Sequence, residues 1–134
     1  MKEFSLHIVT PDKTAFDGKV VSLLMRTKDG DVEILSGHSD ILCALSTGRA
    51  RIRTADGKDI FASVSGGFLS VSGGEASVAA TTFELASELD LKRAEAAKEL
   101  AEQAIKNAKN ARELDLAKAK LQRALTRISV KKMR

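Results

Sequence analysis

The chain of 134 residues contains no tryptophan and no tyrosine, and only five phenylalanines, one proline and one cysteine. So few aromatic side chains disfavour a protein that stacks the bases of single-stranded nucleic acid. The lone Cys43 cannot form an internal disulfide, and the N-terminal residues lack the apolar segment of a signal peptide. No run of about 18 apolar residues is present, so no transmembrane helix is expected. These absences predict a soluble, cytoplasmic protein.

The rest of the composition divides sharply near Ser87. All nine glycines, the one proline and all five phenylalanines lie in residues 1–86. Residues 87–134 contain ten alanines and carry thirteen basic against seven acidic residues, whereas residues 1–86 carry nine against eleven. We therefore predict two domains, 1–86 and 87–134, with different secondary structure.

The first domain is predicted to be all-β. Apolar residues alternate with polar ones around Phe4–Ile8 and Val21–Met25, the period of half-buried strands. Turn signals such as Asp56-Gly57 recur roughly every 8–12 residues, which is typical of a sandwich or barrel. Gly66-Gly67 and Gly73-Gly74 are both interpreted as hairpin turns, because neither pair is followed by the residues of a phosphate-binding loop.

The second domain is predicted to be a helical hairpin. Its first helix is expected to start near residue 88, with Ser87 at cap spacing before Asp90. A second start signal is Asn110, which stands three residues before Glu113. The short connection predicts antiparallel helices. Their contact face is rich in alanine and buries little area, so we expect a hairpin stable enough to form and loose enough to open.

Together these patterns predict an α+β fold. An N-terminal all-β domain, either a sandwich or a barrel, would be followed by a C-terminal antiparallel two-helix hairpin.

No catalytic residues and no metal site are predicted. His38 and Cys43 are the one plausible nucleophile pair, but nothing specifies a third orienting group or an oxyanion hole. A loop histidine and a core cysteine are the favoured interpretation. Two histidines and one cysteine are too few for a zinc site. We therefore expect a protein that is not an enzyme by itself.

Basic residues gather at the end of the chain, at Arg123, Arg127, Lys131, Lys132 and Arg134. Cations favour a helix C-terminus, so part of this enrichment complements the helix dipole. The alternative is an acidic partner: a nucleic-acid backbone, an acidic protein segment or a nucleotide phosphate. No phenylalanine lies among these charges, which disfavours the nucleic acid.

Several segments resemble the family of epsilon subunits of bacterial F-type ATP synthases, and their order and spacing match over the full length of the chain. They are Val9-Thr10-Pro11, Asp29 to His38, Gly48 with Arg51, Gly66-Gly67-Phe68, Leu89 to Ala97 and Arg123 to Ile128. The chain departs from the family at Ser36, where proline is usual, and at Val32-Glu33, where an apolar residue and glycine are typical.

The resemblance implies that the first domain is a β-sandwich of two packed antiparallel sheets, with about ten short strands. It also implies a rotor subunit in the central stalk of a proton- or sodium-translocating ATP synthase. It would join the gamma subunit to the membrane ring of c subunits, at the cytoplasmic face of the membrane and peripheral to it. The loop that approaches gamma and the c ring would include Asp31, Val32, Glu33 and His38.

The resemblance also implies that the hairpin regulates the enzyme. Folded, it would pack on the sandwich; extended, it would enter the catalytic head of alpha and beta subunits and block ATP hydrolysis. The inhibitory contacts would come from Arg123, Arg127, Lys131 and Lys132. A basic nucleic-acid- or ribosome-binding module with a helical arm is the alternative function.

Some members of the family bind ATP on the folded hairpin. The matching positions are Glu84, Leu89, Asp90, Arg93, Ala94, Arg123 and Arg127. Leu100 occupies a position that is basic in ATP-binding members, so one phosphate contact is missing. Loss of a charge-assisted bond of about 1.5–3 kcal/mol lowers affinity roughly tenfold to a hundredfold. We expect this regulatory ATP to bind weakly or not at all, and no other cofactor.

Overall fold

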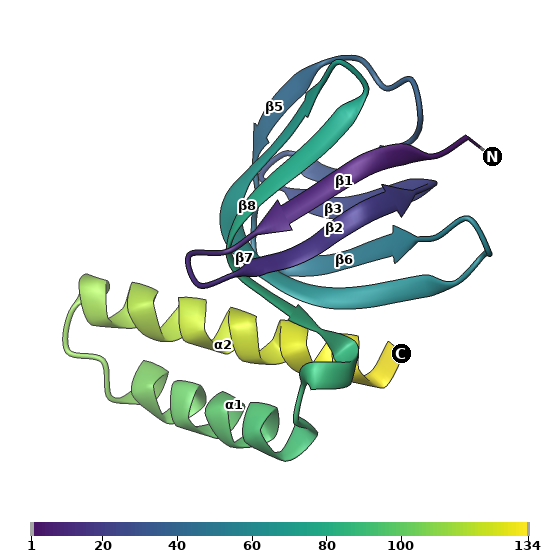
Figure 1. Ribbon diagram of the computed structural model, residues 1–134. Helices are drawn as coiled ribbons and strands as arrows, with labels where there is room; N and C mark the ends of the chain where they lie inside the picture. The colour runs from purple at the N-terminus through teal and green to yellow at the C-terminus, as the bar shows by residue number, and fades with distance from the viewer. Residues whose placement is uncertain (1, 134) are drawn as a thin grey trace.

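The computed structural model describes residues 2–133, which form eight strands followed by a short 3₁₀ turn and two helices (Figure 1). The strands are β1 (Phe4–Val9), β2 (Thr14–Val20), β3 (Ser22–Thr27), β4 (Gly30–Ile34), β5 (Ile41–Ala44), β6 (Gly48–Arg53), β7 (Asp59–Ser72) and β8 (Glu75–Leu85). The turn η1 (Ala86–Glu88) leads into helices α1 (Leu91–Lys106) and α2 (Ala111–Met133).

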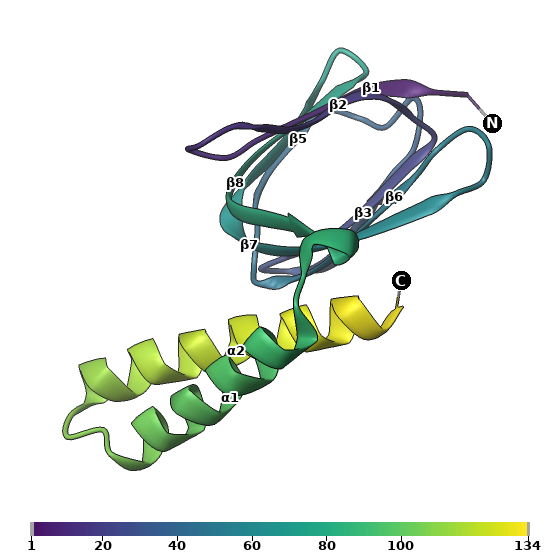
Figure 2. The same ribbon diagram turned by 60° about the horizontal axis from the view of Figure 1, so that its bottom comes forward.

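The strands form an open sheet, in the order β2-β1-β8-β7-β6-β3-β4 with β5 on β7, which folds over into two layers (Figure 2). The start of β7, residues 59–64, pairs with β6, and its end, residues 68–71, pairs with β5. The predicted α+β fold of a sandwich and a helical hairpin is confirmed. Residues 2–133 hold eight strands where about ten short ones were expected, because β7 and β8 are long and serve both layers. One neighbouring pair, β1 and β8, is parallel.

One of the two glycine pairs lies where the sequence did not predict it. Gly73-Gly74 forms the turn between β7 and β8, as expected. Gly66-Gly67 was expected to be a hairpin turn, but it lies inside β7, where the strand passes from β6 to β5. Both of its residues have positive φ, of 66° and 104°. A Cβ on Gly67 would overlap the carbonyl oxygen of Ala79, so this glycine also permits close approach of β8.

The core lies between the two layers of the sandwich. It is filled by the alternate apolar residues of the strands, as the sequence predicted. Leu6, Ile8, Leu23, Ile52 and Leu69 are completely buried, and they come from β1, β3, β6 and β7. Each strand therefore presents its other face outward, and the outer face of the layer that contains β6 is available to receive the hairpin.

The two helices begin at polar caps. Asp90, and not Ser87, caps α1: its Oδ1 accepts the backbone N–H of Arg93 at 3.2 Å. The expected start near residue 88 is wrong because residues 86–88 form the 3₁₀ turn. Asn110 caps α2 as predicted, since its Oδ1 accepts the N–H of Glu113 at 2.9 Å.

The side chains that are fully buried on the two helices are mostly small. Ala94 and Ala101 of α1 and Ala117 and Ala124 of α2 are buried. The main contacts between hairpin and sandwich come from α2, which meets β6, β7 and η1. Figure 2 shows the connection between the helices lying away from the sandwich. The hairpin is thus attached chiefly along the C-terminal part of one helix.

Paired charges cover the outer face of the β3, β4 and β6 region. Arg51 donates to Glu33 Oε2 at 2.8 Å, and the Ser22 hydroxyl donates to the same oxygen at 2.7 Å. Arg53 likewise binds Asp59, with Nε at 2.7 Å from Oδ1. The hydrogen bond from Ser22, followed by the charge of Arg51, holds the pKa of Glu33 below its usual value.

Substitution of Gly67 should be far more costly than substitution of Gly74. Gly67→Ala would force the new Cβ against the Ala79 carbonyl at positive φ, so we expect a loss of about 3 kcal/mol or more in the free energy of unfolding. Gly74→Ala is the matched control, because its φ is 82° but the space around it is open; it should cost about 1–2 kcal/mol. Urea unfolding followed by circular dichroism measures both. Equal losses would contradict the close approach at Gly67.

The hydrogen bond from Ser22 to Glu33 should affect the pH at which acid destabilises the sandwich. A carboxyl group whose pKa is lowered by folding stabilises the fold above its unfolded pKa, and this contribution disappears as the pH falls through the folded value. Ser22→Ala removes the largest cause of the shift, so the pKa of Glu33 should rise and stability should be lost at a higher pH. Carbon NMR titration of the carboxyl groups tests this. The pKa of Asp59, which is lowered chiefly by Arg53, is the internal control and should not move.

Candidate functional site

The hairpin rests on the sandwich through one small apolar contact. Val130 of α2 is completely buried against Ala86 and Leu89 of the linker, with Phe61 of β7 packed beside them. Four side chains bury limited area compared with the core of the sandwich, so this contact fixes the position of α2 more than it stabilises the molecule.

Polar bonds surround the apolar contact, and all of them come from residues 127–133 of α2. Arg127 Nε donates to Glu84 Oε1 at 2.7 Å, and Lys131 Nζ donates to the Ala86 carbonyl at 3.1 Å. Arg49 of β6 reaches α2 from the other side and donates to Ser129 Oγ at 3.2 Å. Because Arg127 and Lys131 are four residues apart, they lie on one face of the helix, the face turned toward β8 and the linker.

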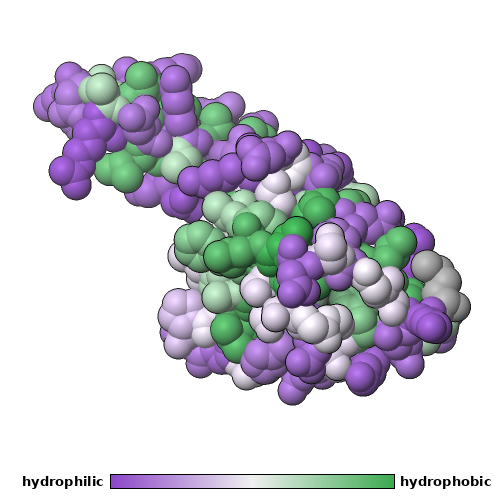
Figure 3. Space-filling view, turned by 90° about the horizontal axis from the view of Figure 1, so that it is seen from above, coloured by the Kyte–Doolittle hydropathy of each residue, from purple (hydrophilic) through white to green (hydrophobic). Residues whose placement is uncertain are grey.

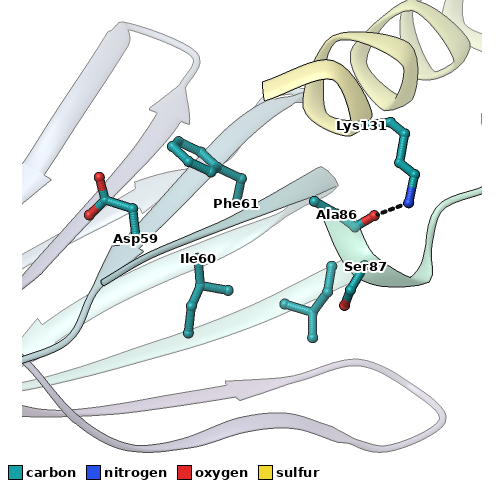
Figure 4. A pocket seen from close by; sticks show the side chains of 7 residues that line it. Asp59, Ile60, Phe61, Ala86, Ser87 and Lys131 are labelled. Atoms are coloured by element: carbon teal, nitrogen blue, oxygen red, sulfur yellow. Dashed lines mark hydrogen bonds between the residues drawn. The ribbon is translucent and has the colours of Figure 1, made fainter. Parts of the chain in front are cut away.

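A cavity of about 500 Å³ opens beside the Lys131 contact. Figure 4 shows Ile60 and Phe61 on the sandwich side, Ala86 and Ser87 in the linker, and Lys131 reaching from α2 to the Ala86 carbonyl. This cavity exists at the joint between the two parts of the chain, so its walls separate if α2 leaves the sandwich.

A second cavity, of about 220 Å³, collects most of the residues predicted to bind ATP. Its lining consists of Glu84, Glu88, Leu89, Asp90, Arg93, Ala94, Ala97 and Arg127. Six of the seven predicted positions are therefore brought together; Arg123 is the exception and lies one helical turn before Arg127, outside the lining. Leu100 is also outside the lining, and its side chain is 68% exposed.

Most of the charged groups of this second cavity already have partners within the chain. Glu84 binds Arg127, as described above. Asp90 caps α1, and Glu88 Oε1 accepts the N–H of Leu85 at 3.0 Å. Three carboxylates and two guanidinium groups line the cavity, so its net charge does not favour an anion unless an ion pair opens.

The cavity nevertheless holds the groups that phosphate recognition uses. Arg93 and Arg127 are planar donors suited to phosphate oxygens. Small-molecule sites usually occupy about 300–1,000 Å³, so a ligand as large as a nucleotide would be only partly enclosed here.

The residues expected at gamma and the c ring do not share one face. Asp31 and Glu33 are exposed on the outer face of β4 and bind Arg26 and Arg51. Val32, between them, packs against the core. His38 lies in the connection after β4, where its Nδ1 is 2.7 Å from the Ser39 carbonyl. This set stays a prediction, and the side chains available for a partner are the two carboxylates and the histidine.

Cys43 has the character of a packed thiol. It is half-buried on β5 against the core, and burial raises the pKa of its thiol, which is the opposite of what an activated nucleophile needs. Within residues 2–133, no three histidine, cysteine or acidic side chains are grouped so that they could hold a metal ion. Neither helix of this part of the chain is long and apolar enough to span a membrane.

The surface divides by hydropathy as well as by fold. In Figure 3 the hairpin is mostly hydrophilic with scattered hydrophobic residues, whereas a broader hydrophobic area lies on the sandwich. Leu42 of β5 and Phe68 of β7 are the most exposed large apolar side chains of the sandwich, at 73% and 58%.

Lys132 of α2 is exposed and Arg123 is half-buried, so the predicted basic contacts are divided between solvent and the sandwich.

Sequence reasoning missed two residues at this joint. Glu88 lines the second cavity, and its place two residues before Asp90, the α1 cap, could have suggested this. Arg49 binds α2 across 80 residues of sequence, and no local pattern reveals such a contact.

The comparisons with known proteins agree over the length of the chain. Residues 3–86 match the model of the beta-sandwich domain of the ATP synthase delta/epsilon chain, and residues 87–132 match the model of its long alpha-helix domain. The ATP synthase epsilon chain of Pediococcus pentosaceus is 38% identical, covering 96% of this chain and 94% of the relative. That of Bacillus velezensis is 35% identical, covering 97% and 98%.

Solved structures share the fold. A chain of the Euglena gracilis mitochondrial ATP synthase, in a structure of OSCP, F1 and c-ring, superposes with a TM-score of 0.80 at 20% identity, covering 90% of this chain and 76% of that one. A chain of the Tetrahymena thermophila central stalk and c-ring gives 0.63 at 17%, covering 97% of each. From its sandwich to its helical hairpin, this chain belongs to the ATP synthase delta/epsilon chain family.

Proposed function

We propose that the chain is a non-catalytic rotor subunit of the central stalk of a proton- or sodium-translocating F-type ATP synthase. It joins gamma to the c ring and contacts the alpha and beta subunits of the catalytic head, peripheral to the membrane at its cytoplasmic face. The match of both domains, in order and over residues 3–132, is the observation that carries this proposal. It supports the rotor function over a basic nucleic-acid-binding module.

The sandwich provides the fixed part of this function. Its core is separate from the hairpin contact, because the buried cluster of the strands and that of Val130 share no residue. The exposed Leu42 and Phe68 offer an apolar surface for gamma, while Asp31, Glu33 and His38 provide the polar contacts near the c ring.

The hairpin provides regulation. In the folded state Arg127 and Lys131 are bound to Glu84 and to the Ala86 carbonyl. The same side chains cannot meet acidic segments of the catalytic head until α2 has left the sandwich. Packing on the sandwich and inhibition therefore exclude one another, and Arg123 and Lys132 on the same helix add to the inhibitory contacts.

ATP binds weakly in the second cavity and favours the folded hairpin. The cavity is lined by β8, the linker, α1 and α2, so a ligand there contacts the hairpin only while it is folded. Binding to one of two states shifts the equilibrium toward that state.

Inhibition should depend on residues 87–134. We expect the full chain to inhibit ATP hydrolysis by a catalytic head with gamma that has been stripped of its own epsilon subunit. A version ending at Ala86 should bind without inhibiting. A second control bridges Arg49→Cys and Ser129→Cys with a flexible bis-maleimide in a Cys43→Ser background, because these positions meet only in the folded state. The bridged protein should bind but not inhibit. If it inhibits as well as the unbridged protein, extension of the hairpin is not the mechanism.

Restoring a basic residue on α1 should strengthen ATP binding. Leu100 lies one turn beyond Ala97, which lines the cavity, so Leu100→Arg places a guanidinium at its rim. Because the site is exposed, we expect ATP to bind about three- to tenfold tighter in titration calorimetry. Leu116→Arg adds the same charge at an exposed position of α2 away from the cavity. An equal gain in ATP affinity in both variants would mean that the added positive charge attracts ATP in general, without a direct contact from residue 100.

A further inference from the structure

One potential phosphate ligand of the second cavity is already occupied by a carboxylate of the same chain. Arg127 Nε lies 2.7 Å from Glu84 Oε1, and both side chains are about two-thirds buried, with 28% and 36% of their surface exposed. A charge-assisted bond of this length in a partly buried place is stronger than an ion pair in open solvent.

We infer that Glu84 is an internal counterion that competes with the phosphate groups of a nucleotide for Arg127. It holds the hairpin to the sandwich while the cavity is empty, and it lowers the affinity of the cavity for anions. This inference rests on the proposed function, and it reverses the part that the family resemblance gives to Glu84, because the residue acts here against the ligand.

The positions of the two partners explain why the pair joins the domains. Glu84 belongs to β8, where it pairs with Ser63 of β7, so the sheet fixes its backbone. Arg127 belongs to α2 and moves with the hairpin. The ion pair is therefore a bond between the fixed and the movable parts of the chain.

The other carboxylates of the cavity are engaged differently. Glu88 accepts the N–H of Leu85 through Oε1, and its Oε2 lies 3.7 Å from Lys13 Nζ. Asp90 accepts the N–H of Arg93 as the cap of α1. Among the described residues, Glu84 is the acid whose carboxylate binds a guanidinium of the cavity, so it is the one that phosphate must displace.

The competition has a consequence that a purely structural ion pair lacks. When a phosphate takes Arg127, the Glu84 carboxylate is left beside an anion and repels it. Removal of the Glu84 charge should thus loosen the empty hairpin and at the same time tighten anion binding. If Glu84 only supported the fold, its substitution would loosen the hairpin and weaken anion binding together.

The test compares Glu84→Gln with wild type and with Glu95→Gln, all as full-length chains. Glu95 is exposed on α1 and outside the cavity lining, so its variant removes the same charge without touching Arg127. Titration calorimetry with ATP and, separately, with inorganic triphosphate measures anion affinity. Amide hydrogen exchange of residues 125–133 without ligand measures how firmly α2 is held.

For Glu84→Gln we expect both anions to bind about three- to tenfold tighter, and exchange in α2 without ligand to become faster. Glu95→Gln should change neither by more than about twofold. Triphosphate has no adenine, so a gain with triphosphate places the effect at the phosphates.

Four outcomes would overturn the inference. Weaker or unchanged triphosphate binding by Glu84→Gln would do so, and so would equal gains in both variants. If wild type binds ATP and Glu84→Gln binds it less well, Glu84 is a ligand and the proposed ATP site stands without the competition. If no anion binds to any of the chains, the competition and the ATP site both fail, while inhibition of the catalytic head still tests the rotor function separately.

Discussion

The seating of Val130 against Ala86, Leu89 and Phe61 fixes where the hairpin lies, and other features of the joint depend on it. With this side chain buried, Arg127, three residues before it, is placed at Glu84, and Lys131, the next residue, at the Ala86 carbonyl. α2 also supplies one lining residue to each cavity at the joint, Lys131 to the first and Arg127 to the second. A small contact therefore organises a large part of the functional surface.

The polar bonds around that contact are suited to exchange. When two parts of a chain separate, buried apolar surface becomes exposed to water and its contribution to stability is lost. A bound arginine or lysine can instead exchange its partner for another carboxylate or carbonyl at little net cost in free energy. The basic end of α2 is thus bound in the folded state and still usable elsewhere. The alanines buried on α1 and α2 also hold the hairpin together weakly, since each buried methyl group contributes only about 0.8 kcal/mol.

Much of the fold could be predicted from the sequence because it follows from local patterns. The strands show in the alternation around Leu6 and Leu23, and α2 shows in its Asn110 cap. The bend at Gly66-Gly67 could not be predicted, because a glycine pair has the same local signature in a turn and in a strand that changes partners. The cavity residues were found by family likeness. Their ion pairing was not, since contacts such as that of Glu84 with Arg127 span 43 residues.

The balance between ligand and internal contacts follows from the arithmetic of weak binding. A ligand that binds one state adds RT ln(1 + [L]/Kd) to the stability of that state, which is only about 0.4 kcal/mol when its concentration equals Kd. An ion pair of partly buried groups contributes a similar or larger amount. The apolar Leu100 and the occupied Arg127 both favour a low affinity for ATP. If the affinity is low, the contacts within the chain decide how often the hairpin is folded. In the proposed regulation, ATP would then adjust an equilibrium that depends mainly on the contacts of Glu84 and Val130.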